Sequence, residues 1–313
     1  MTDPRGELPV GSGATHPFLD AARERVLVLD GAFGTFMQGH DLGPDDFGGE
    51  ALEGCNEQLV VTRPDLVARM HDEFFGVGCD GVETATFGAF PLVLAEYGLE
   101  AETHALNVAA ARVAREVASG HAADGRPRFV IGSIGPGTRL PSLGQIRYAT
   151  LRDGYEAQVE GLIEGGIDVV LVETVYDLLQ AKAAINGARR AMAKAGTLLP
   201  IMVQVTVETT GRMLVGSEIG AALTALEAMR PDVIGLNCAT GPVEMTEHLR
   251  YLARHGRTFL SALPNAGLPS VVEGRTHYDL TPDALAEAHE RFRSEEHTSE
   301  LQSHLNLVCR LLL

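Results

Sequence analysis

Seven short apolar segments recur about every 39 residues along this chain, and most of them end in Gly, Asn, Asp or Pro. They span residues 25–31, 79–87, 128–136, 168–175, 200–207, 232–239 and 259–266. Their unbroken apolar character predicts strands that are covered on both faces, and the spacing matches one strand plus one crossover helix. We therefore expect a parallel sheet.

The stretches between these strands show the apolar period of amphipathic helices. The clearest of them are 64–78, 103–120, 154–166, 177–196, 218–229 and 281–292. Seven such units in 313 residues favour an α/β fold of the (β/α)8 TIM-barrel type, which should have one further strand. The alternative is a doubly wound sheet, but GAFGTF (31–36) fits its glycine fingerprint poorly.

Charge and composition exclude several classes of partner. With 25 Lys and Arg against 42 Asp and Glu, the net charge of −17 repels nucleic acid and anionic membrane surfaces. No apolar run approaches membrane-spanning length, and the N-terminus lacks the layout of a secretory signal. The four cysteines form no C-x-x-C pair, so we expect reduced thiols in a cytoplasmic protein.

Polar residues follow the predicted strands where a barrel places its reactive groups. They are Asp30, Glu83, Ser133, Glu173, Asn237, Cys238 and Asn265. The carboxylates of Asp30 and Glu173, together with an amide and a thiol at the same rim, exceed what helix capping requires. Asp30 and Glu173 suit an ammonium group, and backbone amides after the first and third strands suit a carboxylate. Together these groups predict an amino-acid ligand.

Several motifs carry a family resemblance that extends from about residue 20 to 292. They are VLDGAFGTFMQ (28–38), VETATFGA (82–89), GSIGPG (132–137), DVVLVETVYDLLQAKAA (168–184), IGLNCATGP (234–242) and LPNAGLP (263–269). This set resembles the homocysteine S-methyltransferase domain, in particular the N-terminal module of cobalamin-dependent methionine synthases. One departure is Ala85, where the family usually has Asn in E-T-N-T-F.

The resemblance implies a barrel that binds homocysteine and a Zn²⁺ ion held by three cysteines, one of which maps onto Cys238. Such a site keeps a fourth position open for the substrate thiol, which the metal deprotonates for attack on a methyl group. The family's substrate contacts map onto Asp30, Gly31, Ala32, Ser133, Glu173 and Asn237. The implied methyl donor is methylcobalamin, supplied by cobalamin and folate domains elsewhere in the parent protein.

The other two zinc ligands of the family are adjacent in a G-G-C-C-G motif that ends the eighth strand, and this chain has no such motif. Cys309 is flanked by Val308 and Arg310, and Cys55 and Cys79 are expected to be structural. A lone thiolate cannot hold Zn²⁺. We expect weak or no zinc binding and negligible methyl transfer by this chain.

The last residues change in character, because RSEEHTSELQS (293–303) matches one reading frame of a common sequencing adapter. The expected division is a flexible segment 1–19, a barrel over 20–292 truncated before strand 8, and a non-native tail 293–313. The alternative is a genuine divergent tail that forms an amphipathic helix. Without an eighth strand, we expect the barrel to stay open between its seventh and first strands and to aggregate.

Two other functions remain open from the sequence. One is a stand-alone homocysteine S-methyltransferase that uses S-methylmethionine or betaine. The other is a zinc-free pseudo-enzyme that binds an amino acid without methyl transfer.

Overall fold

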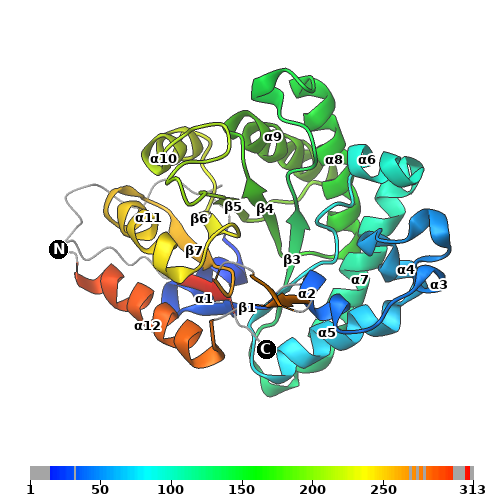
Figure 1. Ribbon diagram of the computed structural model, residues 1–313, viewed down its shortest axis with the longest axis horizontal. Coiled ribbons are helices and arrows are strands. Elements are labelled where there is room, and N and C mark those ends of the chain that lie inside the picture. The colour runs from blue at the N-terminus through cyan, green and yellow to red at the C-terminus, as the bar shows by residue number, and fades with distance from the viewer. Residues whose placement is uncertain are drawn as a thin grey trace.

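The apolar segments form the strands of a barrel surrounded by helices in a computed structural model (Figure 1). The structure describes residues 15–31, 33–267, 270–272, 275–277, 280–298 and 307–310. The strands close in the order β1-β10-β7-β6-β5-β4-β3-β2, and all neighbours in the ring are parallel. The predicted TIM-barrel class is confirmed.

All seven predicted strands are present, each within its predicted segment. They are β1 (Leu27–Leu29), β2 (Gly81–Glu83), β3 (Phe129–Ile134), β4 (Val169–Val175), β5 (Ile201–Val205), β6 (Val233–Asn237) and β7 (Phe259–Leu263). Every residue of β3, β4, β5 and β6 is buried. Continuous apolar runs identify these strands because a parallel sheet is covered on both faces.

The six predicted helices also form, and further helices precede them or lie between them. The longer helices are α1 (Pro17–Glu24), α5 (Pro64–Gly76), α7 (Thr103–His121), α8 (Tyr148–Gly165), α9 (Leu178–Ala195), α10 (Ile219–Glu227), α11 (Pro242–His255) and α12 (Pro282–Thr298). The short ones are α2 (Phe33–Gln38), α3 (Pro44–Phe47), α4 (Leu59–Thr62) and α6 (Pro91–Leu94). No helix of the described residues is both long and apolar enough to cross a membrane.

The eighth position of the barrel corrects one expectation. The seven β/α units predicted from the apolar segments are present. The gap expected between β7 and β1, however, is filled by β10 (Leu307–Arg310), which belongs to the segment assigned to the tail. Val308 pairs with Leu27 of β1 on one side and with Ser261 of β7 on the other. The physical reason is that strand pairing uses backbone groups, so a short extended segment can satisfy two open edges whatever its origin.

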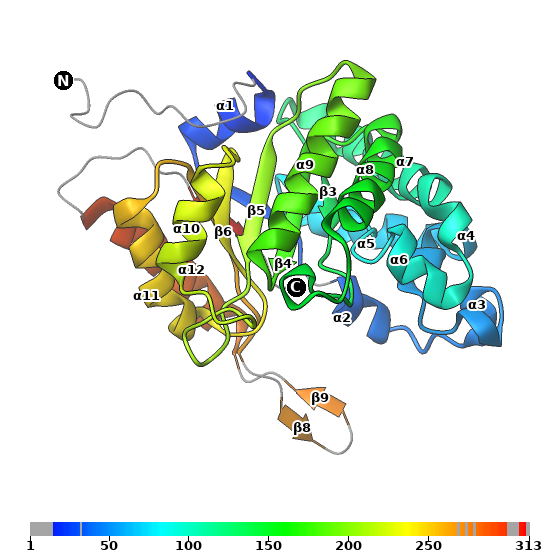
Figure 2. The same ribbon diagram turned by 90° about the horizontal axis from the view of Figure 1, so that it is seen from above.

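Two apolar layers fix the barrel. Alternate strand residues point inward and pack with α1, whose Phe18 meets Phe129 edge to face with ring centroids 5.3 Å apart. The other strand residues pack outward against the helices. Helix α1 lies at the amino ends of the strands, while the hairpin of β8 (Ser270–Val272) and β9 (Arg275–His277) projects from the opposite side (Figure 2). This arrangement leaves the carboxyl end of the barrel for a site.

Gly235 of β6 shows why the barrel interior requires glycine at that position. A Cβ atom there would lie 2.0 Å from Ser261 Oγ on β7. Ser261 Oγ in turn accepts a hydrogen bond from Gln204 Nε2 on β5 at 3.1 Å. Gly235, the glycine of the segment GLNC (235–238), therefore lets β6 and β7 approach closely beside this buried polar contact.

Candidate functional site

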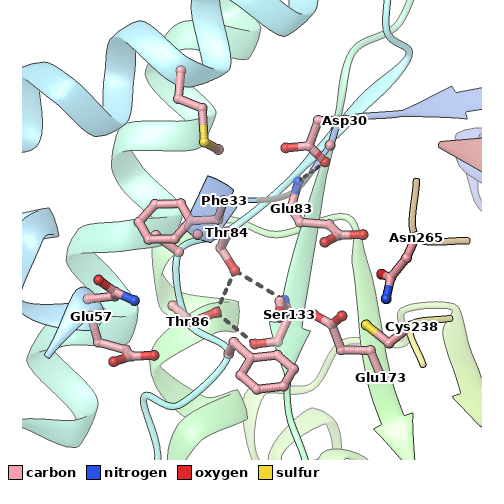
Figure 3. Close-up of a pocket in the computed structure, with 16 residues that line it drawn as sticks. Asp30, Phe33, Glu57, Glu83, Thr84, Thr86, Ser133, Glu173, Cys238 and Asn265 are labelled. Atoms are coloured by element: carbon pink, nitrogen blue, oxygen red, sulfur yellow. Dashed lines mark hydrogen bonds between the residues drawn. The ribbon is translucent and has the colours of Figure 1, made fainter. Parts of the chain in front are cut away.

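A pocket of about 290 Å³ opens at the carboxyl ends of the strands (Figure 3). Its lining includes four carboxylates, from Asp30, Glu57, Glu83 and Glu173, together with the Cys238 thiol. None of the described residues that line it is Lys, Arg or His. An acidic pocket without a basic residue favours a ligand that carries a cation.

Glu173 lines this pocket beside a bulge in β4. Val172 pairs with Val203 but Val175 pairs with Val205, so β4 has one extra residue over this stretch. Thr174 provides it with a left-handed backbone, φ 57°, which is strained for a β-branched residue. The Glu173 side chain is 7% exposed and accepts a short hydrogen bond from the Ser133 hydroxyl.

Ser133 is itself fixed by two threonines that follow β2. Its backbone N–H donates to Thr84 Oγ1 at 3.1 Å, and its carbonyl accepts from the Thr86 hydroxyl at 2.7 Å. The two threonine oxygens lie 2.6 Å apart. All three residues are buried, so the hydroxyl that holds Glu173 has little freedom to move.

Asp30 follows β1 and is fully buried at the edge of the pocket. Its Oδ1 accepts the backbone N–H of Glu83 at 2.9 Å. Figure 3 shows the Glu83 carboxylate directed toward the side of the pocket where Glu173, Cys238 and Asn265 meet. Asp30 therefore adds negative charge to the pocket and also fixes the strand end that presents Glu83.

Cys238 follows β6 in a tight turn. Cys238 and Ala239 both have left-handed backbones, φ 58° and 54°, a conformation that is uncommon outside glycine. The Asn237 amide nitrogen lies 3.5 Å from Cys238 Sγ and 3.2 Å from Glu173 Oε2. Asn237 therefore connects the thiol to the carboxylate that faces the pocket.

Glu57 lines the opposite side of the pocket from Cys238 (Figure 3). Its Oε1 accepts the backbone N–H of Gly88 at 2.8 Å. Burial raises the pKa of the Glu57 carboxyl. A Cβ on Gly88 would lie 2.7 Å from that oxygen, so glycine is needed for this close approach.

The structure brings together most of the residues singled out from the sequence. Asp30, Gly31, Ser133, Glu173 and Cys238 all line the pocket, and Asn237 supports it from behind. Ala32 lies outside the described residues. Cys55 and Cys79 are fully buried in the core, as expected, and burial raises the pKa of both thiols.

Sequence reasoning assigned no role to several lining residues. Glu83 and Asn265 stand near the ends of predicted strands, and that position points to the barrel rim. Glu57 lies in a one-turn helix (Asn56–Gln58), which no apolar periodicity in the sequence predicts. Thr84 and Thr86 matter through contacts with β3 that only the closed barrel creates.

The donor set does not fit a zinc ion. Among the described residues, no cluster of three or more His, Cys, Asp or Glu side chains has the geometry of a metal site. Cys238 is the single thiol in the pocket lining. By backbone register, Cys309 pairs with Ala262 and so stands level with Leu236, two residues before Cys238. We therefore derive no chemical step through zinc for this chain.

Fold and pocket together define a TIM-barrel protein whose acidic site lies at the carboxyl ends of its strands. The family model for homocysteine S-methyltransferase matches residues 27–303. The chain belongs to the homocysteine S-methyltransferase family, whose members are methyltransferases.

Methionine synthases from two mycobacteria are close relatives in sequence. The chain is 52% identical to the Mycobacterium tuberculosis protein and 50% identical to the Mycobacterium leprae protein, over 277 residues in each case. That alignment covers 88% of this chain and 23% of each relative, so the chain spans about a quarter of their length.

Solved structures of the Escherichia coli homocysteine methyltransferase MmuM share the fold. The metallated form superimposes with a TM-score of 0.72 at 19% identity, covering 94% of this chain and 93% of that one. The oxidised form gives a TM-score of 0.69 at 18% identity, covering 94% and 92%.

Proposed function

We propose that this chain is the homocysteine-binding module of a methionine synthase, and that its pocket recognises the substrate by its ammonium group. The observation that carries the proposal is the pocket itself, with four carboxylates, a thiol at one side and no basic residue among its described lining. The similarity to mycobacterial methionine synthases supports it.

In this proposal the ammonium group binds at the Glu173 carboxylate, with Asp30 and Glu83 adding negative charge nearby. Ser133 and Asn237 already donate hydrogen bonds to Glu173, which holds its oxygens toward the pocket. A charged hydrogen bond in such a desolvated site is stronger than one in water. The substrate sulfur would then face Cys238, while backbone N–H groups after β1, at Gly31, would take the substrate carboxylate.

In the proposed parent protein, a zinc ion would activate the homocysteine thiol and methylcobalamin would supply the methyl group. The described residues offer Cys238 alone toward that metal. We therefore propose that the 313-residue chain binds homocysteine but transfers no methyl group at a significant rate.

Sequencing of the genomic DNA downstream of the Phe292 codon tests whether the chain derives from a methionine synthase. The proposal requires an open frame that encodes adjacent cysteines and then further domains.

The rim around the pocket supports docking of a donor domain. Large apolar side chains are exposed after β2, β3, β5 and β6, at Phe87, Leu143, Leu214 and Val243. These strands end at the side of the barrel where the pocket opens, and Phe87 also lines the pocket. Exposed apolar side chains at this side are suited to contact with a protein partner, which in this proposal is the cobalamin domain.

The free thiols support a reducing, cytoplasmic location for the proposed module. Cys55, Cys79 and Cys238 form no disulfide within the described residues.

Binding of L-homocysteine tests the proposed function directly. Titration calorimetry of the 313-residue chain, with a chelator and a reductant present, should show saturable binding of one ligand per chain. The amine-free analogue 4-sulfanylbutanoate should bind at least tenfold more weakly, because it leaves the Glu173 carboxylate without a cation. Equal affinity for the two compounds would show that the pocket does not recognise the amine.

A second candidate, the stand-alone methyltransferase, is favoured by the fold match to MmuM over nearly the full length of both chains. It predicts a downstream frame that ends soon after the adjacent cysteines.

A further inference from the structure

A hydrogen-bonded chain of buried side chains runs behind the pocket from β5 to β6 to β4. Thr206, at the end of β5, donates from its hydroxyl to the carbonyl oxygen of Asn237 at 3.1 Å and lies 3.3 Å from its Oδ1. Thr206 is 1% exposed and lines no part of the pocket. No contact with a ligand therefore explains this hydroxyl.

Asn237 forms two hydrogen bonds with Thr174. Its Oδ1 accepts the Thr174 backbone N–H at 2.9 Å, and its Nδ2 donates to Thr174 Oγ1 at 2.8 Å. Both contacts are made to the residue with the left-handed backbone in the β4 bulge. A strained β-branched residue persists only where its surroundings over-determine it, and these two bonds meet that condition.

The bulge lies directly after Glu173, which faces inward by alternation with Val169 and Leu171. Val170 and Val172 pack in the helix-facing layer, and so does Val175, which strict alternation would turn inward. The extra residue at Thr174 therefore reverses the facing of β4 directly after Glu173. Without the bulge, the strand end that carries this carboxylate would follow a different path.

The same amide also reaches both functional groups of the pocket. Asn237 Nδ2 lies 3.2 Å from Glu173 Oε2 and 3.5 Å from Cys238 Sγ, and the Thr174 hydroxyl donates to the same sulfur at 3.8 Å. Asn237 is therefore one group that contacts both the thiol and the carboxylate.

We infer that Thr206 and Thr174 are positioning residues, which act through Asn237 to hold the Glu173 carboxylate, beside the Cys238 thiol, where the substrate's amine binds. This inference rests on the proposed function, since it takes an amino thiol as the ligand. Both threonines act at a distance from the ligand, through hydroxyl groups that no apolar substitute replaces.

Thr206→Val removes the hydroxyl and keeps the shape of the side chain. Asn237 Oδ1 retains the Thr174 N–H, so the variant is expected to fold. Affinity for L-homocysteine should fall about tenfold. Affinity for 4-sulfanylbutanoate should change less than about twofold, because this analogue lacks the amine that Glu173 binds. Thr206→Ser should restore the lost affinity. Thr174→Val and Thr174→Ser should repeat the pattern.

Thr258→Val is the matched control. Thr258 is also buried, but it lies at the other end of the barrel, just before β7, and its hydroxyl has no hydrogen-bond partner among the described residues. Its affinities for both compounds should equal those of the unaltered chain.

The outcomes separate the two claims. Failure of the unaltered chain to bind L-homocysteine would overturn the proposed function. If the unaltered chain binds and Thr206→Val binds equally well, the positioning role is wrong. Equal weakening of both compounds, without recovery in Thr206→Ser, would show general damage to the pocket and would also overturn the role.

Discussion

Glu173→Gln is expected to weaken binding of L-homocysteine by about 30-fold or more. The substitution keeps the size of the side chain but removes the negative charge that faces the ammonium group, and the single amide oxygen of glutamine can accept from only one of Ser133 and Asn237. A hydrogen bond to a charged partner in a buried site contributes about 2 kcal/mol, which corresponds to that factor. Titration calorimetry in the presence of a chelator measures it.

Glu164→Gln is the control for this loss. Glu164 is exposed on α8 and pairs with Arg112 at 3.4 Å on the surface, where ion pairs contribute little. Its variant should bind as the unaltered chain does. Affinity in Glu173→Gln within threefold of the unaltered value would mean that the ammonium group binds elsewhere.

Val308→Pro is expected to lower the thermal midpoint of the chain by about 4 °C or more. Val308 is paired on both sides, with Leu27 and Ser261, in the strand that closes the barrel. Proline removes a backbone donor from the ladder and fixes φ, and we expect a cost similar to that of proline in a helix interior, about 3 kcal/mol. Each kcal/mol shifts the midpoint of a chain of this length by about 1.5 °C, because the entropy of unfolding is about 2.1 cal/mol/K per residue.

The unaltered chain should give one cooperative transition by calorimetry or circular dichroism. Gln302→Pro, which lies outside β10, is the control and should melt within about 2 °C of it. Equal midpoints for Val308→Pro and Gln302→Pro would show that the segment 307–310 does not close the barrel.

The strand plan could be predicted because burial on both faces leaves unbroken apolar runs, as in β4 and β6. Ser133, Glu173 and Asn237 could be predicted because a barrel gathers its strand ends at one face. These inferences need local sequence and one topological rule, and no knowledge of side-chain packing.

The remaining features depend on contacts between distant segments. The role of Thr206 arises from its neighbour across the β5 and β6 pairing, and Glu57 reaches the pocket from a short loop helix that meets Gly88. Strand β10 could not be predicted from composition, because backbone pairing places few demands on side-chain identity. The sequence predicts a foreign tail, and the apolar end of such a tail can still pair with open strand edges of the barrel.

The origin of the segment 293–313 stays a prediction. Helix α12 continues to Thr298, and the family match continues to residue 303, so neither stops at the boundary drawn from composition. The downstream DNA decides between a foreign tail and a divergent one.

A crystal structure of the 313-residue chain soaked with L-homocysteine is the most direct test of the proposed recognition. We predict that the ammonium nitrogen lies about 3 Å from a Glu173 carboxylate oxygen, with the sulfur directed toward Cys238. An ammonium group bound at Glu57, on the opposite side of the pocket, or a ligand bound outside the pocket, would contradict it.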